Sequence, residues 1–362
     1  MDTTINFSEV LKEIDKLKPI FDAINNNKEN IALFGAGRAS SAVKEYLKTK
    51  GFIIKCFIDN NPSKIGQNID GIPIVSANSP STKDVSAIII TVKSYVKEIK
   101  TQLSEFSCLS FDEWFMIENT EKYQEIRDHY FEDLKSKKVL DTLMLAVLKG
   151  DDSYYLEIAE PEQYFALTPF LNSGKESFVD IGSYVGDAVE KFIWTNCGSY
   201  EHIYVFEPGV KQFKSLQKRI SRLIDEWCLD ENSISLIQAG AAEKNGKASF
   251  NSTGETVLQS TNLDFCEDNT ANAIQVFSLD SKLENKKISF IKADIEGMEV
   301  SMLKGAENLI KTNRPKLAIC TYHNAADLID IIDILKNLVP EYKYALRHHA
   351  VNSSETVLYC WI

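Results

Sequence analysis

The spacing of apolar residues changes several times along the chain, and each change marks an expected structural element. Between residues 5 and 25 they recur with the period of a helix, at Val10, Leu11, Ile14, Leu17 and Ile20. From residue 30 continuous apolar runs replace this period. Such short runs, bounded by turn residues, are typical of buried strands.

In the first third of the chain, strand-like runs alternate with turns and helical stretches. The strand-like runs cover residues 31–34, 52–58, 72–75 and 85–92. Residues 35–40 form a glycine-containing turn that opens a helix to about Lys48. This alternation predicts a small parallel α/β domain within residues 1–110.

Residues 111–170 have apolar positions near a 3.6-residue period with charges between them, which predicts a helical connector. Strand and helix patterns alternate again over residues 171–362, which predicts a second doubly wound sheet. Ligands bind at the carboxyl ends of the strands in such sheets. Two final apolar runs cover residues 342–347 and 355–361.

The most informative pattern is the run 178–187 (FVDIGSYVGD) followed by 204–208 (YVFEP). An apolar strand ends in Asp180 and a turn with Gly182 and Gly186, and a second strand ends in Glu207. Backbone N–H groups of the first turn can approach a ligand, and a carboxylate at the second strand tip can accept bonds from ribose hydroxyls. The layout predicts a nucleoside-containing cofactor. The alternative is that both acids are ordinary helix-cap and strand-end residues.

Further motifs follow in the same half of the chain, at 288–306 (ISFIKADIEGMEVSMLKGA) and 314–323 (RPKLAICTYH). Together with the glycine turn they resemble the FkbM family of S-adenosylmethionine-dependent methyltransferases. The resemblance runs from about Asp152 to the C-terminal end, and residues 154–165 resemble members with an extra N-terminal domain. It implies an α/β class I methyltransferase fold, a mostly parallel doubly wound sheet with a C-terminal antiparallel hairpin, preceded by a smaller Rossmann-like domain.

The resemblance also implies roles for individual residues. The turn after Asp180 would hold the methionine end of S-adenosylmethionine, Glu207 the ribose, and the loop at 238–242 the adenine. Tyr184 departs from the general class I pattern, which often has glycine there. The implied cofactor-binding residues are Asp180, Gly182, Ser183, Tyr184, Gly186, Asp187, Glu207, Pro208, Gly240 and Ala241.

Candidate catalytic residues cluster at the end of the expected fourth strand and its neighbour. Methyl transfer to a hydroxyl requires an in-line acceptor and removal of its proton. We expect Asp294 to be the general base or the hydroxyl-orienting group, with His323 as its partner or as the true base. Glu296 would hold substrate hydroxyls or the cofactor's amino group, and Lys292 would steer an anionic substrate. We expect Asp294 and Glu296 to point to the same side of an extended segment.

Two alternatives apply to this cluster. His323 could be a hydrogen-bonded structural residue. Magnesium held by carboxylates could acidify the acceptor hydroxyl, but no dedicated ligand cluster stands out, so no metal site is predicted.

In the N-terminal part, Gly35, Gly37 and Arg38 form a degenerate G-x-G-x-x-G turn, and Asp59 follows about 20 residues later. The third glycine is replaced by Ser40, and no residues for hydride transfer stand nearby. Residues 57–75 resemble small Rossmann-like domains of sugar-modifying enzymes, which can bind nucleotide-sugars. Nucleotide or nucleotide-sugar binding, dinucleotide binding and a purely structural or oligomerising role remain open.

Composition narrows the class of protein. The 362 residues carry a net charge of −12, with 44% hydrophobic and 25% charged residues. This is typical of a globular protein and disfavours nucleic acid or an anionic membrane as a partner. The seven cysteines form no C-x-x-C pair, as expected for reduced thiols in the cytoplasm. No apolar run is long enough to cross a bilayer, and no secretory signal pattern opens the chain.

The sequence therefore predicts a cytoplasmic O-methyltransferase acting on a hydroxyl of a sugar, nucleotide-sugar or glycoconjugate precursor. The alternative is a nucleotide-sugar oxidoreductase or epimerase that uses the N-terminal domain. A methyltransferase fold that has become a binding module is a third reading, disfavoured by the intact Asp180, Glu207, Asp294 and His323. The identity of the acceptor and the oligomeric state stay open.

Overall fold

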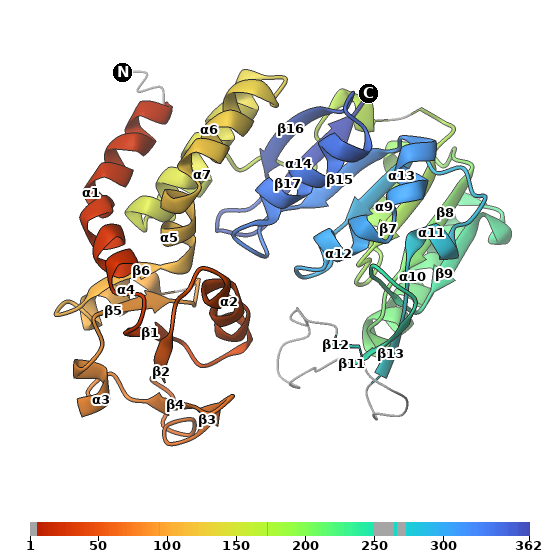
Figure 1. Ribbon diagram of the computed structural model, residues 1–362. Coiled ribbons are helices and arrows are strands. Elements are labelled where there is room, and N and C mark those ends of the chain that lie inside the picture. The colour runs from red at the N-terminus through yellow and green to blue at the C-terminus, as the bar shows by residue number, and fades with distance from the viewer. Residues whose placement is uncertain (1–5, 94, 172, 250–263, 266–272) are drawn as a thin grey trace. The chain divides into compact units, whose positions relative to one another are not determined.

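The computed structural model describes residues 6–93, 95–171, 173–249, 264–265 and 273–362. The chain forms two compact units (Figure 1). The first comprises residues 1–124 and 141–154, and the second comprises residues 125–140 and 155–362. Each unit contains its own parallel sheet, so the predicted α/β class is confirmed.

The first unit is built on a sheet with the strand order β3-β4-β2-β1-β5-β6. Its strands are β1 (Ile31–Phe34), β2 (Ile54–Ile58), β3 (Asn68–Ile69), β4 (Ile72–Val75), β5 (Ala87–Ile90) and β6 (Ser107–Ser110). The central strands β1 and β5 are buried at every residue, the pattern of a parallel strand covered on both faces. Only β3 runs antiparallel to its neighbour, β4, in this sheet as described. The strand at β6 was not predicted.

The first unit contains the helices predicted near residues 5–25 and up to about Lys48, together with short helices that were not predicted. They are α1 (Phe7–Asn26), α2 (Arg38–Thr49), α3 (Pro80–Lys83), α4 (Val96–Gln102) and α5 (Phe111–Glu118). Of the apolar positions that predicted this helix, Val10 and Ile14 are buried, Leu17 and Ile20 are partly buried and Leu11 is exposed. Ser110 and Glu113 form a capping box that fixes the start of α5.

The stretch expected to be a helical connector contains α5, α6 (Thr120–His129), α7 (Leu134–Lys149), α8 (Ser153–Leu156) and the 3-10 helix η1 (Thr168–Phe170). Its residues are divided between the two units. In the second unit, the buried Arg347 pairs with Asp133 (2.9 Å) and with Glu160 (3.2 Å). Burial of this guanidinium is tolerated because carboxylates compensate its charge.

The second unit is built on a sheet with the order β16-β17-β15-β14-β7-β8-β9. Its strands are β7 (Ser177–Ile181), β8 (His202–Phe206), β9 (Ile234–Ile237), β14 (Phe290–Ala293), β15 (Lys316–Cys320), β16 (Lys343–His348) and β17 (Thr356–Trp361). β17 runs antiparallel to both β15 and β16, and this pairing confirms the predicted C-terminal hairpin. β7 pairs in parallel with β14 on one side and β8 on the other, so the strand order reverses beside β7.

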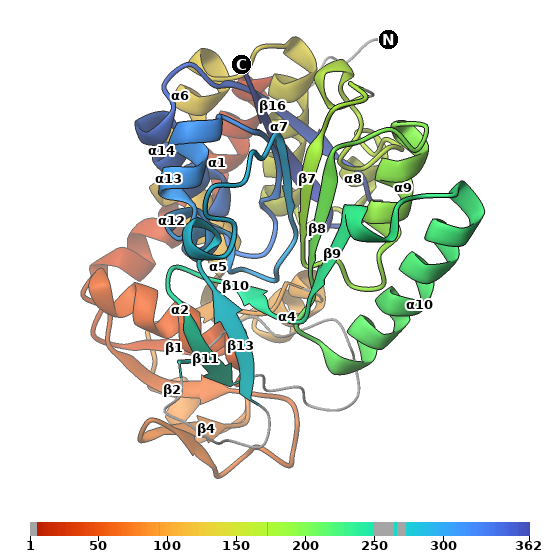
Figure 2. The same cartoon turned by 90° about the vertical axis from the view of Figure 1, so that its right-hand side faces the viewer.

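Helices cover both faces of this sheet. They are α9 (Asp187–Thr195), α10 (Val210–Trp227), the 3-10 helix η2 (Glu231–Ser233), α11 (Leu279–Lys282), α12 (Glu299–Lys304), α13 (Glu307–Asn313) and α14 (Asp327–Leu338). Figure 2 shows α9 and α10 on one side of β7, β8 and β9, and α12, α13 and α14 on the other. A small sheet of β10 (Gly240–Ala241), β11 (Gly246–Ser249), β12 (Asp264–Phe265) and β13 (Ala273–Phe277) follows β9.

Aromatic rings form much of the core of the second unit. Phe178 of β7 stacks on Phe192 of α9 with ring centroids 4.4 Å apart, and Phe290 of β14 lies 4.8 Å from Phe178. These rings fix β7 and β14 against α9. The carboxyl ends of the two strands therefore emerge side by side, where a doubly wound sheet places its ligand site.

Two composition-based expectations are also testable on the fold. Cys56 and Cys320 are buried, and the cysteines within the described residues are free thiols. No helix in the described part of the chain combines the length and the apolar character needed to cross a bilayer.

Candidate active site

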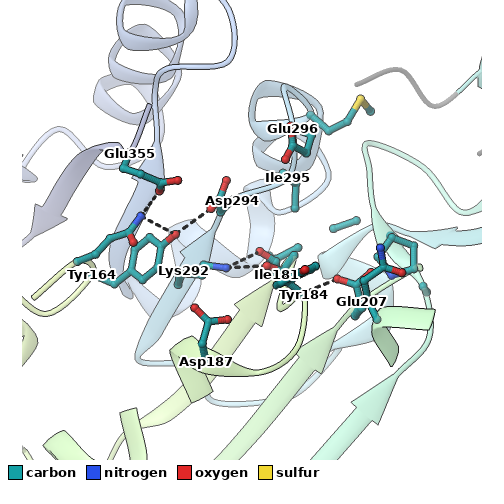
Figure 3. A pocket seen from close by; sticks show the side chains of 18 of the residues that line it. Tyr164, Ile181, Tyr184, Asp187, Glu207, Lys292, Asp294, Ile295, Glu296 and Glu355 are labelled. Carbon is teal, nitrogen blue, oxygen red and sulfur yellow. Dashed lines mark hydrogen bonds between the residues drawn. The ribbon is translucent and has the colours of Figure 1, made fainter. Parts of the chain in front are cut away.

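A cavity of about 270 Å³ lies at the carboxyl ends of β7, β8 and β14. Figure 3 shows Glu207 toward one end of this cavity and Asp294 and Glu355 toward the other. Among the predicted site residues, the cavity wall includes Gly182, Tyr184, Asp187, Glu207, Pro208, Gly240, Ala241, Lys292, Asp294 and Glu296. Asp180, Ser183, Gly186 and His323 do not line it, and Asp180 and Ser183 are buried.

The turn after β7 is held by its neighbours. The N–H groups of Gly182 and Ser183 both donate to the carbonyl of Phe206, at 3.0 and 3.1 Å. Gly182 has φ +73°, and a Cβ there would lie 1.9 Å from the carbonyl oxygen of Asp294. Gly186 has φ +86°, and its Cβ would meet Leu216 at 2.7 Å. The two glycines are therefore required by close packing of the strand ends as well as by backbone conformation.

Glu207 is seven per cent exposed, and both of its carboxylate oxygens accept backbone bonds. Oε2 accepts from the N–H of Tyr184 at 2.8 Å, and Oε1 from the N–H of Gly209 at 2.7 Å. Burial raises the pKa of Glu207 to about 7, although these two bonds oppose the shift. Each oxygen keeps a second lone pair, so the carboxylate can accept two further donors from the cavity.

Lys292 and Asp180 form a buried ion pair between β14 and β7, with Nζ 3.0 Å from Oδ1. The same ammonium donates to the carbonyl of Gly182 at 2.7 Å and lies over the ring of Tyr164, 5.1 Å from its centre. Burial alone would lower the pKa of Lys292, but the nearby charges of Asp180 and Asp294 raise it. This arrangement gives no support to the expectation that Lys292 steers an anionic substrate, because its charge is compensated within the strand ends.

Asp294 stands at the opposite end of the cavity from Glu207 and accepts hydrogen bonds from two tyrosines. Tyr164 donates to Oδ2 at 2.9 Å and Tyr322 donates to Oδ1 at 3.2 Å. His323 Nε2 lies 3.5 Å from Oδ1. The carboxylate is thus held in a fixed orientation beside the cavity.

The segment after Asp294 is a turn rather than the extended segment that was expected. β14 ends at Ala293, Glu296 has φ +57° and Gly297 has φ +93°. Asp294 and Glu296 both line the cavity, but the turn and not strand alternation brings them there. Burial raises the pKa of Glu296 to about 7, with the charge of His323 opposing the shift and that of Asp294 adding to it.

Sequence reasoning missed several residues of this end of the cavity. Tyr164 comes from the segment before β7, and Glu355 from the residue before β17. Gln163 donates to Glu355 and to the Tyr164 hydroxyl, which joins both to Asp294 (Figure 3). Because both residues lie far from Asp294 in the sequence, no local sequence pattern links them to it. Tyr322 lies within the motif at 314–323, beside the predicted residue His323.

The loop expected to flank the adenine is built from small residues. Ala239, Gly240 and Ala241 line the cavity, and all three are buried. Gly240 and Ala241 form β10, which pairs in parallel with Val276 and Phe277 of β13. This stretch therefore presents backbone and small side chains to the cavity.

Two groups of described side chains have the spacing of metal ligands: Asp294 with Glu299 and His323, and Asp294 with Cys320 and Glu355. In the first, His323 and Glu299 bind each other at 3.0 Å. In the second, burial raises the pKa of the Cys320 thiol well above its usual value, which disfavours the thiolate that a metal requires. Neither group is the all-oxygen set that magnesium prefers.

In the first unit, the predicted nucleotide-binding residues form an internally bonded turn. Asp59 Oδ2 accepts from the N–H of Ala36 at 2.9 Å and pairs with Lys64 at 3.0 Å, and Oδ1 accepts from Asn61 at 2.8 Å. Gly35 has φ +106°, and Gly37 is the N-cap of α2. The side chain of Arg38 lies outside the described residues. Asp59 is thus engaged in organising the glycine turn.

Two segments of the chain match models of protein families. Residues 180–345 match the family model described as "Methyltransferase FkbM domain". The expected resemblance to FkbM methyltransferases is confirmed for this segment. The match supports methyl transfer, in general terms, as the activity of the second unit. Residues 27–110 match a model described as "C2185-like, N-terminal".

Among solved structures, the chain is similar to an FkbM methyltransferase from Methylobacillus flagellatus KT, with 21% identity, a TM-score of 0.61 and 98% of each chain covered. At this identity the likeness shows the fold, which is that of a class I methyltransferase. It is also similar to an rRNA methylase from Streptococcus thermophilus (15% identity, TM-score 0.33, 52% of this chain and 87% of the other). M. capricolum TrmK in complex with S-adenosyl-homocysteine has 11% identity and a TM-score of 0.29, over 52% of this chain and 62% of the other. Similarity at the level of the last two says nothing of activity.

No curated protein matches the sequence.

Gly182→Ala should destabilise the second unit by about 3 kcal/mol or more, because the added Cβ overlaps the carbonyl of Asp294 and the residue has a positive φ. Gly198→Ala is the matched control. Gly198 also has a positive φ, but its Cβ would meet side chains and no backbone, the nearest being the Trp227 ring at 3.2 Å, so a cost of about 1–2 kcal/mol is expected. Urea denaturation measures both. Equal losses in the two variants would refute the close-packing role.

Proposed function

We propose that the second unit binds S-adenosylmethionine and transfers its methyl group to a hydroxyl of a sugar, nucleotide-sugar or glycoconjugate precursor. The observation that carries the proposal is the position of Glu207. Its carboxylate lies in the wall of a cavity that also contains the Gly182 turn and extends to Asp294. The match of residues 180–345 to a methyltransferase domain supports the same reading.

The residues of the cavity fit the parts of this cofactor. The remaining lone pairs of Glu207 suit a ribose diol, and the backbone of Ala239–Ala241 suits a flat base. The N-terminus of α9, a helix of nine residues, begins at Asp187 after Gly186 and suits a carboxylate. Asp187 itself lines the cavity and suits an ammonium group. When bound, the cofactor supplies an electrophilic methyl group.

At the other end of the cavity, Asp294 would accept the hydrogen bond of the acceptor hydroxyl and take its proton. The two tyrosine hydroxyls fix the carboxylate so that one geometry is available to the acceptor. Glu296 and Glu355 lie in the same part of the wall and can accept bonds from further hydroxyls. A set of carboxylates beside two tyrosines suits a polyol, which presents many donors.

The charge of this end also limits the acceptor. Asp294, Glu296 and Glu355 line it, and the ammonium of Lys292 is compensated by Asp180. A phosphate or carboxylate beside these groups would be repelled. The portion of the acceptor that enters here should be neutral. If the acceptor is a nucleotide-sugar, its phosphates should lie away from Asp294.

The competing activity, a nucleotide-sugar oxidoreductase or epimerase, would use the turn at Gly35 and the carboxylate of Asp59. Both oxygens of Asp59 already accept backbone bonds, and Lys64 compensates its charge. These contacts favour a role for Asp59 in holding the turn. The methyltransferase reading therefore stands ahead, and nucleotide-sugar binding by the first unit remains a proposal of its own.

Glu207→Gln should weaken the affinity for S-adenosylmethionine by about tenfold or more, because a charge-assisted pair of ribose bonds is lost. The NH₂ group of the glutamine must also face the backbone N–H of Tyr184 or of Gly209, where two donors oppose each other. In the unaltered chain the affinity should rise between pH 6 and pH 8, since Glu207 deprotonates near pH 7 and only the charged form accepts donors at both oxygens. The variant should lose most of this pH dependence.

Isothermal titration calorimetry of the full chain measures both effects. Glu226→Gln is the control, because Glu226 lies on the same unit and pairs only with the exposed Arg222 at 2.7 Å in its described contacts. Unchanged affinity and pH dependence in Glu207→Gln would remove the assignment of the ribose site.

Asp294→Asn should leave cofactor affinity within about threefold and reduce turnover by roughly 10²–10⁴, the usual contribution of a positioned base. The amide keeps the shape of the carboxylate and can still bond to Tyr164 and Tyr322. Single-turnover methyl transfer measures the rate, with the exposed Asp225→Asn as control. A rate close to that of the unaltered chain would mean that another group receives the proton.

A further inference from the structure

Asp294, Glu299 and His323 bring three side chains that can bind metals together at the Asp294 end of the cavity. Each offers one ligand atom, and these atoms all lie within 4.8 Å of one another. Nδ1 of His323 lies 3.0 Å from Oε1 of Glu299, and Nε2 lies 3.5 Å from Oδ1 of Asp294. Ligands that bind one ion at roughly 2.0–2.2 Å stand about 3.0–3.6 Å apart. The spacing of the three side chains therefore suits a shared ion.

Glu299 has an oxygen that no hydrogen bond accounts for. It is the first residue of α12 and is fully buried. Oε1 accepts from the N–H of Ile295 at 2.9 Å, whereas Oε2 is buried and has no hydrogen-bond partner within the described part of the chain. Buried polar atoms are nearly always satisfied, so such an atom requires an explanation. An oxygen of this carboxylate belongs to the clustered ligand atoms, and a bound ion would satisfy it.

The buried acids of this region lack a lysine or arginine partner. Asp327 of α14 lies near Glu299 and is three per cent exposed, and it accepts hydrogen bonds from Asn324. In the described ranges, neither Glu299 nor Asp327 forms an ion pair with a lysine or an arginine. The ammonium of Lys292 is paired with Asp180. Because an uncompensated buried charge costs several kcal/mol, a bound cation would stabilise this arrangement.

We propose that Asp294, Glu299 and His323 bind a divalent transition-metal ion, such as Mn²⁺ or Zn²⁺, at this end of the cavity. The sequence alone predicted no metal site. The imidazole nitrogen favours these ions over magnesium, which prefers oxygen ligands. Asp294 lines the cavity, so the ion would face it. Glu296 also lines the cavity, and its Oε2, 3.7 Å from Nε2 of His323, would supply a fourth ligand.

The use of this ion in catalysis rests on the proposed function. Oδ1 of Asp294 accepts one bond from Tyr322 and keeps a lone pair for the ion. Oδ2 accepts one bond from Tyr164 and keeps a lone pair that can receive the proton of the acceptor hydroxyl. An acceptor oxygen that binds the ion as a further ligand loses this proton more readily. Binding of the ion itself requires neither cofactor nor acceptor.

Isothermal titration calorimetry with MnCl₂ tests the site on the full chain, after treatment with a chelating resin and without cofactor or acceptor. One Mn²⁺ per chain should bind, and Mg²⁺ should bind at least about tenfold more weakly. His323→Gln should weaken Mn²⁺ binding by at least about tenfold, because the imidazole ligand is lost. His129→Gln, at an exposed histidine of the same unit, is the matched control and should bind Mn²⁺ as the unaltered chain does.

A crystal structure of the unaltered chain with MnCl₂ locates the ion by its anomalous scattering, even if His323→Gln does not fold. The peak should lie within about 2.5 Å of ligand atoms of Asp294, Glu299 and His323. Absence of Mn²⁺ binding, a peak elsewhere, or full binding by a folded His323→Gln would overturn the proposal. Mn²⁺ binding without S-adenosylmethionine binding would support the metal site and contradict the proposed function. S-adenosylmethionine binding without Mn²⁺ binding would do the reverse, so the two proposals fail separately.

Discussion

Asp180 and Lys292 face each other from neighbouring parallel strands, with their charged atoms 3.0 Å apart and both side chains almost wholly removed from water. Burying either charge alone would cost several kcal/mol, so each strand end requires the other. The pair stands in register, since Lys292 of β14 lies opposite Asp180 of β7. Through Nζ the pair also holds the carbonyl of Gly182. The cavity depends on this alignment, because Gly182 and Asp294 each lie two residues after a member of the pair.

The alignment divides the cavity into two chemical environments. Beside Glu207 and the small residues of β10, the wall offers backbone groups and one buried carboxylate that can exchange a proton near neutral pH. Beside Asp294 the wall offers carboxylates and tyrosine hydroxyls. A nucleoside suits the first environment and a neutral polyol suits the second. This division underlies the proposed methyl transfer to a hydroxyl, and the match to a methyltransferase domain supports methyl transfer as the reaction type.

Much of the fold could be predicted because its strands are continuous apolar runs and its turns carry glycine. The runs at 31–34 and 178–181 became β1 and β7 nearly residue for residue. The position of Glu207 at a strand tip followed from the same logic. The C-terminal hairpin was expected from the resemblance of residues 342–347 and 355–361 to class I methyltransferases, and cross-strand pairing of Leu346 with Leu358 confirms it.

What could not be predicted depends on contacts between distant residues. The ion pair of Lys292 with Asp180 could not be predicted, because the sequence does not reveal that the two residues lie opposite each other on neighbouring strands. Tyr164 lies 130 residues before Asp294, and no periodicity relates the two. Glu299 was visible in the motif at 288–306, but its burial and its contact with His323 at 3.0 Å follow only from the folded chain. Contacts of this kind are set by three-dimensional neighbours rather than by local pattern.

The central claim, that one cavity binds the cofactor at Glu207 and presents the acceptor to Asp294, is tested most directly by a crystal structure of the full chain with S-adenosylhomocysteine. The account predicts that both ribose hydroxyls donate to the carboxylate of Glu207, that the adenine lies against Ala239–Ala241, and that the sulfur is directed toward Asp294. A product bound elsewhere, or bound in this cavity with its ribose away from Glu207, would contradict it.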